Sequence, residues 1–111
     1  MLRRLVLLVL FSVLSSWPAT AEEAKVAVQM KGIGSFTCAH WRSTPATRTE
    51  GTIWILGFWT GLNYVAAASE QNQPNVNEME MMSQVEKVCA HHPSQVLASA
   101  VWKAYLDTNK N

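Results

Sequence analysis

Two cysteines and three histidines are the residues best suited to chemistry, and they form two short clusters, Cys38-Ala-His40 and Cys89-Ala-His91-His92. Thiolate and imidazole groups are the usual ligands of a structural zinc ion. On a helix, however, residues two apart point to nearly opposite sides, so Cys38 and His40 make a poor pair of ligands. Only His92 would share a face with Cys89. We therefore predict no metal site and no cofactor.

The histidines support two other interpretations. A disulfide between the cysteines would bring His40, His91 and His92 into one neighbourhood, where they would charge near pH 6.5 and repel one another, as in a pH sensor. Alternatively, His91 and His92 simply end a helix, whose C-terminal dipole tolerates their charge. Histidines that end a helix are the more common case. The possibility of a pH sensor makes His40, His91 and His92 candidate pH-sensing groups.

Other chemistry has little support. Met79, Met81 and Met82 could offer thioether ligands to Cu(I), but flexible methionines more often fill cores or contact varied protein surfaces. The chain has no nucleophile elbow, paired-carboxylate motif or glycine-rich phosphate loop. Four tryptophans fit the core of a small domain better than a ligand cage: Trp41, Trp54, Trp59 and Trp102. We therefore predict that the protein is not an enzyme.

The N-terminus has the features of an export signal. Arg3 and Arg4 precede an apolar run, and Ala19 and Ala21 follow in the small-x-small pattern that signal peptidase cleaves. The run of about ten residues is too short for a bilayer, which needs about 20, so a cleaved signal peptide over residues 1–21 is favoured over a membrane anchor. We predict a periplasmic protein without membrane attachment after cleavage.

The charge of the exported part differs from that of the whole chain. The 111 residues include nine Lys and Arg and eight Asp and Glu, but residues 1–21 hold two of the bases and no acid. The remaining 90 residues have a formal charge of −1. This length makes one small domain and excludes a Rossmann domain, a barrel or a kinase. A charge so near zero provides no electrostatic footprint for nucleic acid.

An oxidising compartment favours a disulfide between Cys38 and Cys89, which are the only cysteines. Closing a loop of this length is worth about 4 kcal/mol in the chain-entropy model, a large share of the stability of a small domain. An intermolecular bridge is the alternative.

Hydrophobic periodicity predicts an all-α domain over residues 36–111, a small bundle of about four helices, after a flexible N-terminal arm over residues 22–35. The first helix spans residues 36–42, with Ser35 or Thr37 as its cap, and stops before Pro45.

The later helices also have recognisable ends. The longest runs from a cap at Thr49 to about Ser69, and the third follows Asn77 and ends at His91-His92-Pro93. The last opens at Pro93 or Ser94 and has an apolar stripe made of Leu97, Ala100, Val101, Ala104 and Tyr105. The disulfide would then join the first helix to the third.

Gly57 and Gly61 lie four residues apart in the longest helix, where each costs about 1 kcal/mol relative to alanine. Two such residues suggest that another backbone packs closely there. We expect this neighbour to belong to the same chain, and a homodimer seam is the alternative.

Three segments together resemble a known family: Thr37-Cys38-Ala-His-Trp41, the helix from Trp54 to Asn63, and Val88-Cys89-Ala-His-His-Pro93. After a signal peptide, they are similar to the HdeA/HdeB family of small periplasmic acid-stress proteins, over about residues 36–106. The resemblance implies a disulfide-stapled helical fold, often dimeric at neutral pH. On acidification such a protein loosens and its exposed apolar surface holds unfolding periplasmic proteins.

Applied to this sequence, the resemblance makes one apolar surface the candidate for client binding or dimerisation, formed by Trp54, Gly57, Phe58, Gly61 and Leu62. The composition can support an acid response. When the eight acids are protonated, seven bases and three histidines remain charged in residues 22–111, and the balance moves from −1 to +10. Self-repulsion of this size destabilises a compact state. A similar two-cysteine layout occurs in periplasmic immunity proteins of type VI secretion, so a folded inhibitor of a secreted toxin is the alternative function.

Overall fold

A computed structural model describes residues 28–110 of the chain. Its elements are a short 3-10 helix and four α-helices: η3 (Gly32–Ser35), α1 (Cys38–Trp41), α2 (Pro45–Ala68), α3 (Glu78–His91) and α4 (Leu97–Thr108). The prediction of a small all-α bundle is confirmed for this part of the chain. The predicted signal peptide, residues 1–21, and residues 22–27 of the predicted arm lie outside the described residues.

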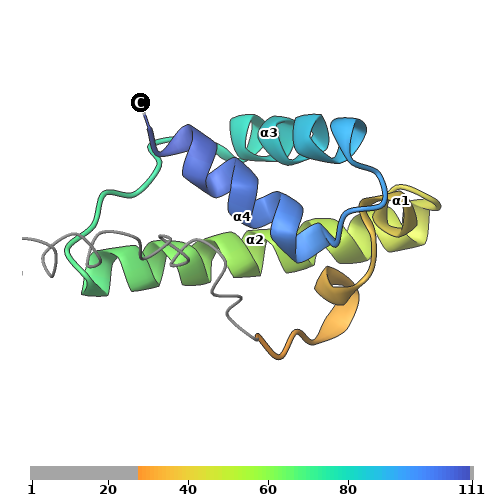
Figure 1. Cartoon of the computed structure of the whole chain (residues 1–111), viewed down its shortest axis with the longest axis horizontal. Helices are drawn as coiled ribbons and strands as arrows, with labels where there is room; N and C mark the ends of the chain where they lie inside the picture. Colours follow the sequence, from red (N-terminus) through yellow and green to blue (C-terminus); the bar gives the residue numbers. More distant parts are fainter. Residues whose placement is uncertain (1–27, 111) are drawn as a thin grey trace, which may run out of the picture.

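The last helix forms the centre of the bundle. Figure 1 shows α4 between α3 and the long helix α2. Because α4 has neighbours on both sides, its predicted apolar stripe is buried throughout: Leu97, Ala100, Val101, Ala104 and Tyr105. The same core includes Ile55 and Trp59 of α2 and Val85 of α3. Within residues 28–110, no helix has the length and apolarity needed to cross a membrane.

The caps explain where the first three α-helices begin. The Asn77 side chain accepts a hydrogen bond from the Glu80 amide at the start of α3, as predicted. At the start of α1 the Thr37 side chain accepts from the His40 amide, so Thr37 is the cap and not Ser35, the other predicted candidate. The predicted cap of α2 is wrong by about one turn. Thr44 caps this helix by a reciprocal arrangement with Thr47, and Pro45 occupies its first turn, where a missing N–H costs nothing.

The sequence predicted that the fourth helix opens at Pro93 or Ser94. Residues 93–96 bond instead to the segment that leads into the first turn of α1. The Cys38 amide donates to the Gln95 carbonyl, and the Leu97 amide donates to the Phe36 carbonyl, each at 2.8 Å. These bonds fix residues 93–96 as a turn that ends in an isolated β-bridge between Thr37 and Val96. The last helix therefore begins only at Leu97.

Part of the predicted N-terminal arm packs on the bundle. Ile33 in η3 is 2% exposed, and the Trp54 indole N–H donates to the Lys31 carbonyl at 3.1 Å. Gly34 lies directly against the Trp54 ring. The sequence placed these residues in a flexible arm over residues 22–35, whereas η3 is a packed part of the domain.

Helix α2 turns a different face to the core from the one suggested by its most apolar spacing. Ile55 and Trp59 are buried, whereas Ile53 and Val65 are 67% and 61% exposed. Because α2 is apolar on most of its circumference, its own pattern does not select the inner face. Packing against α4 and η3 does so.

Candidate functional site

The disulfide between Cys38 and Cys89 joins α1 to α3, as predicted, and is intramolecular. Both cysteines are fully buried, with their Cα atoms 5.3 Å apart. Oxidised cysteines do not ligate zinc. Among the described residues, no group of three or more His, Cys, Asp and Glu side chains could hold a metal ion.

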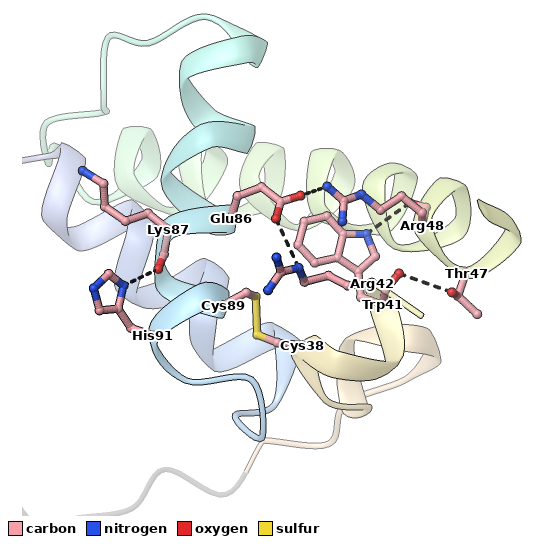
Figure 2. A network of polar contacts seen from close by, with 9 residues as sticks. All are labelled: Cys38, Trp41, Arg42, Thr47, Arg48, Glu86, Lys87, Cys89 and His91. Atoms are coloured by element: carbon pink, nitrogen blue, oxygen red, sulfur yellow. Dashed lines mark hydrogen bonds and ion pairs between the residues drawn. A yellow bond between two sulfur atoms is a disulfide. The ribbon is translucent and has the colours of Figure 1, made fainter. Parts of the chain in front are cut away.

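The three candidate pH-sensing histidines are exposed. The rings of His40 and His91 contact residues four positions earlier in the chain. The His40 ring stacks on Phe36 at 4.8 Å between centroids, and His91 Nδ1 lies 2.8 Å from the Lys87 carbonyl in the preceding turn (Figure 2). His92 is the C-cap residue of α3. These contacts favour the role of His91 and His92 as the end of a helix.

The methionines of α3 do not converge on one point. Met81 is buried in the core, Met82 is half-buried against it, and Met79 is 84% exposed. A Cu(I) site needs several thioethers directed at the same ion. The spread of these side chains is instead typical of a helix with one buried face.

The outward side of α2 is exposed along most of the helix. We call it the outer α2 face. Its exposed residues are Ile53, Gly57, Thr60, Gly61, Tyr64, Val65 and Ala68. No charged residue occurs between Glu50 and Glu70, so this face has no charge along most of the helix. Exposed apolar surface of this kind is common at sites of protein–protein contact.

Gly57 and Gly61 belong to the outer α2 face and not to an internal contact. A β-carbon built on either residue has no atom of another described element within 4 Å. The expectation that another part of the same chain packs against them is therefore not met within residues 28–110. If a second backbone explains the two glycines, it belongs to another copy of the chain in a homodimer or to another partner.

The other predicted surface residues border this face. Trp54 and Phe58 stack with ring centroids 4.9 Å apart, and both are half-buried, as is Leu62. They pack against the core on one side. The five residues predicted as one surface thus divide into two exposed glycines and three bulky side chains at the edge of the core.

A polar network lies where α1, α2 and α3 meet (Figure 2). Glu86 of α3 forms ion pairs with Arg42 and with Arg48, which come from the end of α1 and from α2. The Arg48 guanidinium also lies 4.7 Å from the ring centroid of the buried Trp41. No sequence signal identified these residues, because Glu86 and Arg48 are 38 positions apart and charged residues are ordinary on helix surfaces.

A shallow groove runs along the exposed side of α4. It is lined by Trp102 and Leu106, which are 46% and 42% exposed, and by Lys103 and Gln95. Of the four tryptophans predicted for the core, Trp41 and Trp59 are buried there, Trp54 is half-buried and Trp102 lies in this groove. The described structure therefore presents apolar side chains on both α2 and α4.

Comparisons of the chain with protein-family models, with curated proteins and with solved structures find no match.

Proposed function

We propose that the protein is a non-enzymatic, HdeA/HdeB-like periplasmic protein that holds unfolding proteins when acid loosens its fold. The observation that carries this proposal is the outer α2 face, an apolar and uncharged surface on a small bundle stapled by a disulfide. Surfaces rich in apolar and small residues accept varied clients because they impose few polar constraints. Loosening of the bundle would add the edge residues Trp54, Phe58 and Leu62 to this surface.

The charge balance supplies the response to acid. Residues 22–111 change from −1 to +10 when their carboxylates are protonated and their histidines are charged. Self-repulsion then favours an expanded state that keeps its helices but loses tight packing. Because the disulfide is covalent, it persists in acid and limits the expansion, which favours refolding after neutralisation.

A titration of the oxidised protein between pH 7 and pH 2 tests the proposal. We expect increased binding of an apolar dye and suppression of the aggregation of an acid-unfolded client protein over the same pH interval. The double variant Ile53→Lys, Tyr64→Lys should suppress client aggregation less well, because two charges then lie on the outer α2 face. Gln73→Lys, at an exposed position in the loop before α3, is the control for added charge. Neither dye binding nor suppression at any pH would contradict the proposal.

A folded, immunity-type inhibitor of a secreted toxin is the second candidate. The observation in its favour is that the outer α2 face is already exposed in the folded bundle and needs no acid to uncover it. Such a protein would bind its toxin at pH 7 in the folded state and would not need to unfold partly in acid. A gene for a secreted amidase or another toxin beside its own gene would favour this alternative.

A further inference from the structure

One carboxylate holds α3 to the corner between α1 and α2. Glu86 Oε2 lies 3.5 Å from Arg42 Nε, and Glu86 Oε1 accepts a hydrogen bond from Arg48 Nη2. The Glu86 side chain is 26% exposed, which is less than in any of the ion pairs of α4. The Arg42 and Arg48 side chains are 39% and 44% exposed, so solvent screens both pairs in part. A carboxylate shared by two cations nevertheless contributes more than an isolated surface ion pair.

The two arginines lie against the packed interior. Arg48 covers the ring of Trp41, and the Trp41 indole N–H donates to the Arg48 carbonyl at 3.1 Å. Trp41 is fully buried and fills the space above Gly51 at the start of α2. Movement of Arg48 would therefore disturb the packing of α1 on α2.

The single negative charge of Glu86 is paired with two positive charges. Arg42 and Arg48 face it from the two neighbouring elements, while Lys87 of α3 itself points to the other side of that helix (Figure 2). Lys103 of α4 and Lys110, which follows the end of that helix, pair with Asp107 instead. Protonation of Glu86 would leave two guanidinium groups side by side without an anion, and their attraction to α3 would be lost.

We propose that Glu86 is an acid-sensitive latch that holds α3 on the α1–α2 corner and releases it when its carboxylate is protonated. Its role as a trigger of client binding rests on the proposed function. The disulfide between Cys38 and Cys89 joins the same elements and does not respond to acid. Release would thus open the corner around Trp41 while the staple keeps α3 tethered.

The test compares the pH dependence of unfolding in the oxidised wild type and in Glu86→Gln, measured by urea denaturation between pH 7 and pH 3. The amide has the shape of the acid but no charge. At pH 7 we expect the unfolding equilibrium constant of Glu86→Gln to be about tenfold larger, as for a lost charged hydrogen bond. The two curves should converge as the pH falls, because protonation of the wild-type carboxylate removes the charge that Glu86→Gln lacks at every pH.

Two further variants sharpen the comparison. Arg42→Gln removes one arm of the latch without touching Trp41 and should give a smaller change that also vanishes in acid. Asp107→Asn removes the exposed pairs of α4 and should stay within about twofold of the wild type at every pH. Curves for wild type and Glu86→Gln that remain parallel down to pH 3, or that coincide at pH 7, would overturn the latch.

This experiment is independent of client binding. Convergent curves in a protein that suppresses no aggregation would establish the latch and contradict the proposed function. Parallel curves in a protein that does suppress aggregation would support the function and overturn the latch.

Discussion

Gly51 faces the indole of Trp41 so closely that a β-carbon on Gly51 would overlap the ring. Trp41 is fully buried at this contact, and its N–H donates to the Arg48 carbonyl one turn earlier in α2. The backbone of α2 thus lies directly on the tryptophan of α1. Gly57 and Gly61, farther along the same helix, face no other element of the described bundle. Glycines in one helix therefore have two different roles, and substitutions can separate them.

Gly51→Ala should lower the free energy of unfolding by about 1–3 kcal/mol, because the added methyl group forces the Trp41 ring to move. The better helix propensity of alanine offsets only part of this cost. Urea denaturation at pH 7 measures the change. A variant as stable as the wild type would show that the corner can adjust without strain.

Gly57→Ala and Gly61→Ala should have the opposite effect and each raise the free energy of unfolding by about 0.5–1 kcal/mol. The new methyl groups enter open space, and alanine is the better helix former. If the outer α2 face is a contact surface, the same variants should weaken self-association or client binding. Analytical ultracentrifugation and the client assay measure this. A double variant that is more stable and binds as well as the wild type would remove the two glycines from the contact.

The sequence predicted those elements whose patterns are local. The stripe of α4 from Leu97 to Tyr105 is a regular helical period with one buried side, and Asn77 with Glu80 marks the start of α3 by a local cap. The disulfide followed from the cysteine count, since only one intramolecular pairing exists.

Features that depend on contacts distant in sequence were missed. The start of α2 is an exception, because its signal is local: Thr44 and Pro45 were interpreted as the end of α1, although the same two residues cap and open α2. The outward position of Gly57 depends on which side of an almost uniformly apolar helix packs on α4. The pairing of Glu86 with Arg48 also depends on how the helices pack. No local sequence pattern around either residue indicates this pairing.

Removal of the disulfide by replacing Cys38 and Cys89 with serine should lower the free energy of unfolding by about 4 kcal/mol, because the unfolded chain regains the entropy of a loop closed over 51 positions. Denaturation of the oxidised wild type and of the variant at pH 7 measures the loss. The wild type treated with a reductant is the matched control and should approach the variant. An unchanged melting curve would mean that the bridge does not stabilise the fold.

Tyr105 should make the protein sensitive to alkali. Burial raises the pKa of its phenol above the ordinary value near 10, since the charged form is poorly solvated. The unfolded chain therefore ionises first as the pH rises. The stabilising contribution is fully present below about pH 10 and is lost as the pH rises through the higher pKa of the folded state.

Tyr105→Phe tests this dependence directly. The phenol O–H donates to Asn63 Oδ1 at 3.1 Å, and its loss should cost about 1 kcal/mol at pH 7. Above pH 10 the variant should lose less stability than the wild type, because it has no buried phenol to ionise. Urea denaturation between pH 7 and pH 11 measures both effects. Tyr64→Phe, at a side chain that is 77% exposed, is the control and should keep the alkaline loss of the wild type. A Tyr105→Phe variant whose stability falls as steeply as that of the wild type above pH 10 would contradict the assignment of this loss to Tyr105.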